Sequence, residues 1–342
     1  MTDPMTGKMP DDTVGAVPGG AAPWPSSDDM VGAAFGEAPD GVSRLSSEEG
    51  VDRSTGRAMG SPSGRAMGSL PSSGRRYRML AFDLDGTLVN SEKEITPPVR
   101  AAIHEAISAG VQVVLASGRP LVGVAPVADA LALDELGGYV LSNNGARVIE
   151  WRSKEVVADL TLPHVAVEVA CGVAHEFGFD TLVYDDRYLY SERPEARWVE
   201  QERFNNSSIA KRVDDLAAFV TWEPNKVMVV GDPDRLMVAQ EALEVRLAGV
   251  ADVFLSEPYF IEIVPPGVRK GAAIAEIAER HGIPREEIIA VGDGYNDIPM
   301  LDYAGLAVAM DNSYPGVKEH ADWIAPSNDE DGVVDVVKRF VL

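Results

Sequence analysis

The chain has 342 residues, of which 45% are hydrophobic and 25% are charged, a composition typical of a globular protein with one large domain or two ordinary ones. Its 54 Asp and Glu residues against 30 Lys and Arg give a formal net charge of -24. This charge argues against nucleic acid or an anionic membrane as the partner, because binding to polyanions depends on Lys and Arg that displace counterions. If the substrate is an anion, the binding site must offset this repulsion with a cation or with backbone N–H groups that point at the substrate.

The sequence contains little that points outside the cytoplasm. A single cysteine, Cys171, rules out an intrachain disulfide. No apolar run reaches the ~18 residues of a membrane-spanning helix. Residues 1–25 contain no basic segment followed by an apolar stretch, which is the pattern of a secretory signal. By elimination, we expect a cytoplasmic protein.

Residues 1–76 differ from the rest of the chain. They are rich in Gly, Pro, Ser and Asp, and the six residues GRAMGS occur twice, at 56–61 and 64–69. Such a segment buries too little apolar surface to offset the entropy lost on ordering it. We therefore predict a disordered, low-complexity tail. A start codon assigned too early is an alternative origin of this tail, because Met79 lies at the first predicted strand.

From Tyr77 onward, apolar runs alternate with segments of helical spacing. The predicted strands and helices of this part, in chain order, are 79–82 (strand), 97–109 (helix), 111–116 (strand), 138–142 (strand), 270–281 (helix) and 288–291 (strand). This alternation is typical of a parallel sheet covered on both faces. The fold class predicted is α/β, with a Rossmann-like, doubly wound parallel-sheet core.

The middle of the chain, residues 160–264, is less regular. Two helical patterns, 165–177 and 235–248, lie among hairpin-like strands at 181–191, 226–230 and 260–264. We interpret this segment as an inserted α+β domain. It divides the core domain into two parts, 77–159 and 265–342.

The first motif, FDLDGTL at 82–88, follows the first predicted strand. Ligands of open parallel sheets bind beyond the carboxyl ends of the strands. There, Asp83 can act as a nucleophile that forms an aspartyl-phosphate. Asp85 can donate a proton to the leaving oxygen and then deprotonate the attacking water. A simple acidic turn is the alternative, but the preceding apolar strand and the following Gly-Thr-Leu favour the functional interpretation.

Two shorter signals follow. In LASGRP, at 115–120, the Ser117 hydroxyl and nearby backbone N–H groups can approach phosphate oxygens, although alone this segment reads as a turn beside a surface arginine. Lys270 lies at the N-terminal edge of a predicted helix, where the helix dipole favours anions. A bound anion explains this lysine better than a solvated surface position does.

The fourth motif, VGDGYND at 291–297, again follows an apolar strand. Mg²⁺ prefers oxygen ligands, and Asp293 can supply one, while Asp297 can hold a bound water or orient its neighbours. Together the motifs bring four carboxylates to one crevice, where they repel each other and any phosphate. A divalent cation and Lys270 would relieve that repulsion. The side chain of Asp85 must then stay off the metal if it is to carry a proton.

The ordered set DLDGTL, ASGRP, a lysine and GDGYND resembles the haloacid dehalogenase-like (HAD) phosphatases. The long insert and the stretch SNNGA at 142–146 resemble the Cof-type branch of that superfamily, which has a large inserted cap. The resemblance extends from about residue 78 to the C-terminus.

This resemblance implies a set of site residues. It makes Asp83 the nucleophile and Asp85 the acid/base. The implied Mg²⁺ ligands are Asp83, the backbone carbonyl of Asp85, and Asp293. The implied phosphate-binding groups are Ser117, Lys270, Asn296 and the backbone N–H of Leu84, with Thr87 and Asp297 as supporting residues.

The resemblance also implies that residues 160–264 form a mobile cap over the site, and that the substrate is a small phosphorylated metabolite such as a sugar phosphate. Two alternatives stay open at this point. A phosphomutase would return the phosphoryl group to a bound sugar, and a sugar-phosphate sensor would bind without turnover. The sequence predicts no oligomeric state.

Overall fold

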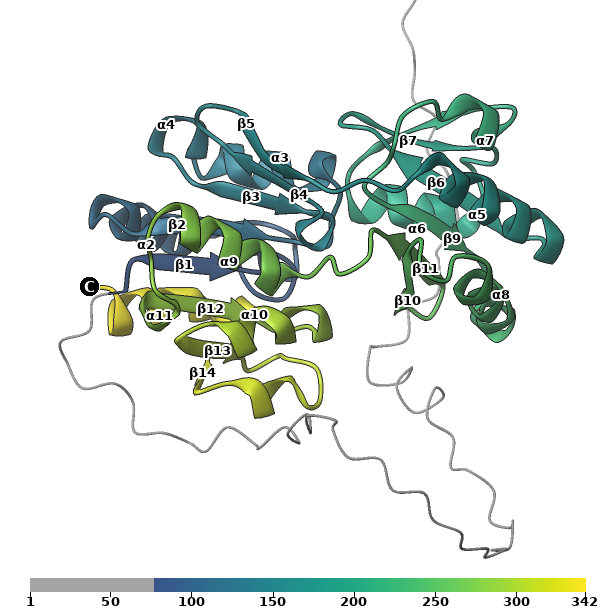
Figure 1. Ribbon diagram of the computed structural model, residues 1–342. Helices are drawn as coiled ribbons and strands as arrows, with labels where there is room; N and C mark the ends of the chain where they lie inside the picture. Colours follow the sequence, from purple (N-terminus) through teal and green to yellow (C-terminus); the bar gives the residue numbers. More distant parts are fainter. Residues whose placement is uncertain (1–76) are drawn as a thin grey trace, which may run out of the picture. The chain divides into compact units, whose positions relative to one another are not determined.

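The structure is a computed structural model that describes residues 77–342 (Figure 1). The predicted tail, residues 1–76, lies outside the described residues. The described part contains one eight-stranded sheet and one six-stranded sheet. Among its helices, none combines the length and the apolar character that a membrane span requires.

The eight-stranded sheet forms the core domain. Its strand order is β14-β13-β12-β1-β2-β3-β4-β5. The six strands from β14 to β3 are parallel, and β4 and β5 continue the sheet in antiparallel pairing. The strands are β1 (Met79–Phe82), β2 (Gln112–Ala116), β3 (Tyr139–Ser142), β4 (Arg147–Glu150), β5 (Glu155–Asp159), β12 (Ile288–Gly292), β13 (Leu306–Met310) and β14 (Trp323–Ala325).

Strand β1 is the switch point of this sheet. The chain proceeds from β1 to β2 and β3 on one side, and β12, β13 and β14 lie on the other side. In the register, Phe82 pairs with Leu115 of β2 and with Val291 of β12. The carboxyl ends of these three strands therefore lie side by side, at the place where open α/β sheets bind ligands.

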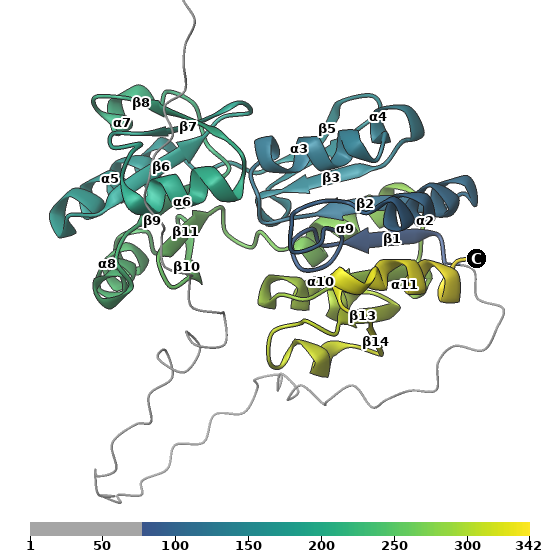
Figure 2. The same ribbon diagram turned by 180° about the vertical axis from the view of Figure 1, so that it is seen from behind.

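Helices cover both faces of the core sheet. Alternate residues of β1 point to opposite faces, so that Leu80 and Phe82 belong to one apolar cluster and Met79 and Ala81 to another. The first cluster is completed by α2 (Pro97–Ser108), α3 (Leu121–Ala130), α4 (Leu133–Leu136) and α11 (Gly332–Phe340), seen in Figure 2. The second is completed by α9 (Lys270–Arg280) and α10 (Ile298–Tyr303), seen in Figure 1. The α/β class with a parallel core sheet, predicted from the sequence, is confirmed.

The six-stranded sheet is formed by the insert. Its order is β10-β11-β9-β6-β7-β8, and all pairs are antiparallel except β7 with β8. The strands are β6 (Asp180–Tyr184), β7 (Tyr188–Ser191), β8 (Ile209–Arg212), β9 (Val227–Val230), β10 (Asp252–Glu257) and β11 (Phe260–Val264).

Four helices accompany the second sheet: α5 (His164–Phe177), α6 (Arg197–Asn205), α7 (Leu216–Phe219) and α8 (Pro233–Arg246). Apolar residues of α5 and α8 pack with one set of alternate strand residues, such as Val229 and Ile261. The other set, such as Met228 and Phe260, packs with Val199 of α6. Glu262 pairs with Met228 in the register, so this second face also carries buried charge.

Candidate active site

The site is built on the loops that follow β1, β2 and β12. The backbone N–H of Asp83 donates to the carbonyl of Val291 at 2.9 Å, which ties the first residue after β1 to the end of β12. The N–H of Ser117 donates to the carbonyl of Leu141 at 3.0 Å, so the residue after β2 is fixed against β3. Asp83, Ser117 and Asp293 thus follow neighbouring parallel strands at one edge of the sheet.

A buried lysine lies between two of the predicted aspartates. The Nζ atom of Lys270 is 2.6 Å from Asp83 Oδ1 and 2.6 Å from Asp297 Oδ1. Lys270 and Asp297 are both fully buried. Burial alone would lower the pKa of Lys270, but the two carboxylates outweigh it and raise that pKa above its ordinary value. The unusual place of this lysine at the start of a helix is therefore explained by its two acidic partners.

Asp297 also shapes the loop that carries Asp293. Its Oδ2 atom accepts hydrogen bonds from the backbone N–H groups of Asp293 (2.9 Å) and Gly294 (2.8 Å). Both of its carboxylate oxygens therefore already have N–H partners. This arrangement suits Asp297 to orient its neighbours rather than to leave an oxygen free for a ligand.

Asp293 lies close against the first loop. The hydroxyl of Thr87 donates to Asp293 Oδ1 at 2.8 Å. A Cβ atom at Gly86 would lie 2.2 Å from Asp293 Oδ2, and Gly86 has a φ of +73°, which other residues rarely adopt. Only glycine therefore allows this approach of the two loops.

Burial and nearby negative charge raise the pKa values of two of the acidic groups. Burial, together with the charge of Asp297, raises the pKa of Asp293 to about 7. The same two causes raise the pKa of Asp83 well above its ordinary value, against the opposing effect of Lys270. Carboxylate oxygens of Asp83, Asp293 and Asp297 lie within 4.8 Å of one another. This crowding of hard oxygen ligands, with negative charge that one lysine does not balance, fits a divalent cation such as Mg²⁺.

Asp85 has different partners. Arg119 donates from Nε to Asp85 Oδ2 at 2.6 Å and from Nη2 to Oδ1 at 2.5 Å, and Lys93 Nζ lies 2.5 Å from Oδ1. Burial raises the pKa of Asp85, but the two cations prevail and lower it below its ordinary value. The carboxylate of Asp85 is not part of the cluster formed by the other three aspartates.

The remaining predicted residues lie in the same loops and have partners outside the aspartate cluster. Ser117 is buried, and its Oγ accepts a hydrogen bond from the N–H of Arg119 at 3.1 Å. Asn296 donates from Nδ2 to Asn144 Oδ1 at 3.0 Å. Leu84 lies between the two aspartates of the first loop, and its carbonyl accepts N–H groups of the turn that follows, including that of Thr87.

The family model for haloacid dehalogenase-like hydrolases matches residues 80–337. The chain belongs to this family. The resemblance read from the four motifs is thereby confirmed.

Relatives of this haloacid dehalogenase-like hydrolase include phosphatases. The 5-amino-6-(5-phospho-D-ribitylamino)uracil phosphatase YcsE of Bacillus subtilis (strain 168) is 29% identical over 275 residues, which are 78% of this chain and 96% of the relative. A solved haloacid dehalogenase-like hydrolase from Bacteroides thetaiotaomicron is 40% identical, with a TM-score of 0.75 over 77% of this chain and 99% of that one. A solved structure from Thermotoga maritima is 32% identical, with a TM-score of 0.69. The match covers 78% of this chain and 98% of that one. The chain is a phosphoric monoester hydrolase.

Three residues at this site are not predicted from the sequence. Arg119 lies inside the ASGRP motif, which by itself indicates a surface arginine, although this side chain binds Asp85. Asn144 lies in the SNNGA stretch and contacts Asn296. Lys93, the second cation on Asp85, belongs to no motif. The local signal for Arg119 is its place in the loop that follows β2, after Ser117 and Gly118.

Proposed function

We propose that this hydrolase is a Mg²⁺-dependent phosphatase of small phosphorylated metabolites, sugar phosphates or related esters, and that it acts through an aspartyl-phosphate on Asp83. The observation that carries the proposal is the buried ammonium of Lys270, 2.6 Å from Asp83 and 2.6 Å from Asp297, with Asp293 in the same cluster. A carboxylate nucleophile beside a buried cation suits attack on a phosphate ester, whose charge must be balanced in the transition state.

The metal would be held by Asp83, the backbone carbonyl of Asp85, and Asp293. When bound, Mg²⁺ neutralises charge on the transferring phosphoryl group. The raised pKa values of Asp83 and Asp293 support this, because burial and the charge of Asp297 disfavour the charged form of both groups, and a bound cation would favour it. Asp297 serves as a positioning residue, since Lys270 and two backbone N–H groups occupy its oxygens.

The residues of this chain would then carry the reaction in two steps. First, a carboxylate oxygen of Asp83 bonds to phosphorus while the ester oxygen leaves and takes a proton from Asp85. Because Arg119 and Lys93 lower the pKa of Asp85, this step uses the minor, protonated form of that carboxyl group. Second, water bonds to phosphorus and gives a proton to Asp85, while the bond between phosphorus and the Asp83 oxygen breaks. Inorganic phosphate then leaves, and Asp83 is again a free carboxylate. The hydroxyl of Ser117, Lys270, Asn296 and the backbone N–H of Leu84 would hold the phosphate oxygens throughout.

We further propose that residues 160–264 act as a cap on a core formed by residues 77–159 and 265–342. A cap that closes over the site would exclude bulk water during transfer. A small-metabolite substrate is supported by the relative YcsE, whose name states a phosphorylated ribitylamino compound as its substrate.

The test is phosphate release from p-nitrophenyl phosphate and a panel of phosphorylated sugars, flavins and cofactors by the full chain, with Mg²⁺ or with EDTA. We expect release only with Mg²⁺ and none from Asp83→Asn. Equal release in EDTA would overturn the metal requirement. Isomerised sugar phosphate with little free phosphate would overturn hydrolysis in favour of mutase chemistry.

A further inference from the structure

The loop that follows β13 contacts both of the loops that approach each other at Gly86 and Asp293. Asn312 of this loop donates from Nδ2 to the carbonyl of Gly86 at 2.7 Å. Two residues later, the backbone N–H of Tyr314 donates to the carbonyl of Asp293 at 3.0 Å. A Cβ atom at Gly86 would overlap the Asp293 carboxylate, so these two residues are in close contact. The loop after β13 therefore holds both partners of this contact.

Asn312 is itself fixed by the segment that precedes α11. The backbone N–H of Asn328 donates to Asn312 Oδ1 at 3.1 Å. Asn328 is buried, and its Nδ2 atom donates to the carbonyl of Val89 at 2.9 Å. Asn312 is exposed, yet both polar atoms of its amide have partners, and these partners set its orientation because one accepts and the other donates. The amide thus connects Gly86 to a segment that also binds Val89.

The next residue of this segment makes a further contact with the first catalytic loop. Asp329 accepts hydrogen bonds from the backbone N–H (2.8 Å) and from the hydroxyl (2.7 Å) of Ser91. The loop is thus held at residues 86, 89 and 91 by side chains that lie 226, 239 and 238 positions further along the chain. We call these three side chains, Asn312, Asn328 and Asp329, the C-terminal brace.

Gly86 is a position at which the first loop needs such support. Its φ of +73° and its close approach to Asp293 both require glycine. Glycine restricts the backbone less than other residues do, so the peptide between residues 86 and 87 can rotate readily. That peptide leads to Thr87, whose hydroxyl donates to Asp293 Oδ1 at 2.8 Å. The hydrogen bond from Asn312 to the Gly86 carbonyl opposes a rotation that would separate Thr87 from Asp293.

We propose that Asn312 is a positioning residue of the metal site, which fixes the Gly86–Thr87 peptide, and with it the Asp293 carboxylate, in the arrangement that binds Mg²⁺. The inference rests on the proposed function and adds to it a residue that is not among the metal or phosphate ligands. Groups that orient metal ligands commonly contribute about 10- to 100-fold to metal affinity.

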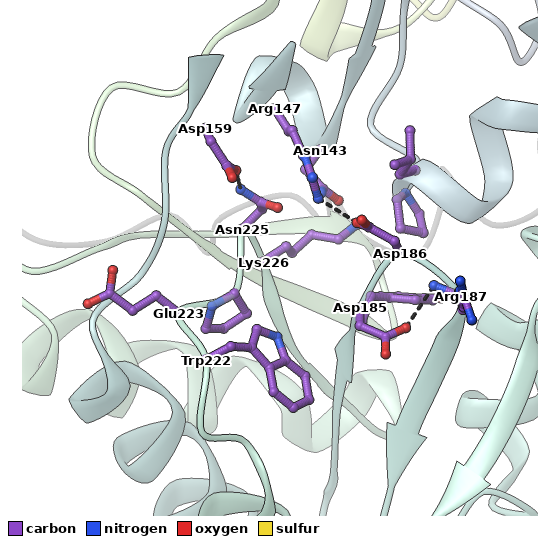
Figure 3. Close-up of a pocket in the computed structure, with 14 residues that line it drawn as sticks. Asn143, Arg147, Asp159, Asp185, Asp186, Arg187, Trp222, Glu223, Asn225 and Lys226 are labelled. Atoms are coloured by element: carbon purple, nitrogen blue, oxygen red, sulfur yellow. Dashed lines mark hydrogen bonds and ion pairs between the residues drawn. The ribbon is translucent and has the colours of Figure 1, made fainter. Parts of the chain in front are cut away.

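The brace is separate from the contacts that the insert makes with the core. Figure 3 shows a cavity of about 360 Å³ whose lining residues include Asn143 and Lys226. Lys226 donates from Nζ to the carbonyl of Gly118 at 3.2 Å, in the loop after β2. None of residues 311–331 lines this cavity. A substitution at Asn312 therefore alters the support of the metal site and leaves the lining of the cavity unchanged.

Asn312→Asp and Asn312→Ala test the inference, by isothermal titration calorimetry of the full chain with Mg²⁺ alone. Aspartate keeps the acceptor for Asn328 but removes the donor to Gly86, and its negative charge would by itself attract the cation. If Asn312 positions the ligands, the Kd for Mg²⁺ should nevertheless rise by about tenfold in both variants. Unchanged or tighter binding in either variant would overturn the inference.

Asn205→Asp is the matched control, because it places the same charge on an exposed asparagine of α6 whose Oδ1 accepts a hydrogen bond from Gln201 at 2.9 Å. It should leave the Kd for Mg²⁺ unchanged, and an equal rise in this control would contradict a specific role of Asn312.

Urea unfolding in EDTA separates positioning from folding. The urea midpoints of both Asn312 variants should match that of the wild type, because the lost hydrogen bond is exposed. A rise in Kd that comes only with a lowered midpoint would overturn the inference. Absence of Mg²⁺ binding to the wild type would overturn the metal requirement of the proposed function as well, whereas equal Kd values for the wild type and both variants would overturn the inference alone.

Discussion

Arg119 donates one hydrogen bond to each carboxylate oxygen of Asp85. Its Nε atom is 2.6 Å from Oδ2, and its Nη2 atom is 2.5 Å from Oδ1. Arg119 also donates from Nη1 to the carbonyl of Gly123 at 3.1 Å, so the guanidinium itself is anchored to α3. The pair directs the Asp85 carboxylate away from the cluster around Lys270. A bidentate pair of this kind specifies orientation as well as charge.

Replacement of Asp83 and replacement of Asp85 should impair different steps of the reaction. With p-nitrophenyl phosphate, whose leaving group needs no proton, Asp85→Asn should still form the aspartyl-phosphate but hydrolyse it slowly. We expect a burst of nitrophenolate of up to about one equivalent per enzyme, followed by a slow phase. Asp83→Asn should show neither phase. Rapid-quench kinetics measure both, and a steady rate without a burst in Asp85→Asn would contradict these roles.

Replacement of Arg119 by lysine should separate orientation from charge. Lysine keeps the positive charge but loses the two-pronged geometry. We expect kcat for a sugar phosphate to fall by about tenfold or more, because Asp85, the acid that protonates the leaving oxygen, is no longer held in the required orientation. The rate with p-nitrophenyl phosphate should fall much less. Parallel losses with both esters would show that Arg119 acts on the phosphate rather than through Asp85.

Removal of the buried lysine should cost stability as well as activity. Lys270→Met leaves Asp83 and Asp297 without their cation in a buried site. We expect the free energy of unfolding in EDTA to fall by about 3 kcal/mol or more. Lys318→Met is the matched control, since Lys318 forms an exposed pair with Asp311, and its effect should stay within about 0.5 kcal/mol. Urea unfolding compares them, and similar losses would contradict the structural role of Lys270.

A methyl group at Gly86 should disrupt the site. It would lie 2.2 Å from Asp293 Oδ2 at a φ of +73°. We expect Gly86→Ala to lower kcat/KM by about 100-fold or more, because the two loops must move apart. Gly178 has a similar φ of +76° but no atom within 4 Å of such a methyl group. Gly178→Ala should therefore lower the free energy of unfolding by about 1 kcal/mol and leave the activity unchanged. Equal activity of the two variants would refute this account.

Glu202 should make stability fall as pH rises. It is buried in α6 and accepts a hydrogen bond from Tyr184, and burial, opposed by Lys226 and reinforced by Glu262, raises its pKa to about 7. Between its ordinary pKa of 4.5 and 7, the folded chain keeps a proton that the unfolded chain releases, so stability declines through this window.

Glu202→Gln keeps the shape of this side chain and removes the titration. The free energy of unfolding of the wild type, relative to this variant, should drop by up to about 3 kcal/mol between pH 4.5 and pH 8. Urea unfolding at a series of pH values measures the difference. A difference that does not change with pH would mean that Glu202 is charged throughout.

Much of the fold could be predicted from the sequence, because its signals are local. The inner strands β1, β2, β3 and β12 are continuous buried runs, and each is followed by polar or glycine residues that end it. The strands that the sequence does not predict include β5, β8 and β10, which are largely exposed. An edge strand with little buried surface leaves no apolar pattern to read.

The candidate site also has a part that local sequence patterns predict and a part that they do not. The acidic motifs that follow strand ends can be identified from the sequence alone, since each motif and its strand lie within a few residues. Which side chains contact one another depends instead on the tertiary fold. Lys270 reaches Asp83 across 187 positions of the chain, Asn296 reaches Asn144 across 152, and Arg119 reaches Asp85 across 34. These contacts depend on the strand order and on the packing of helices against the sheet, and no local pattern records either of them.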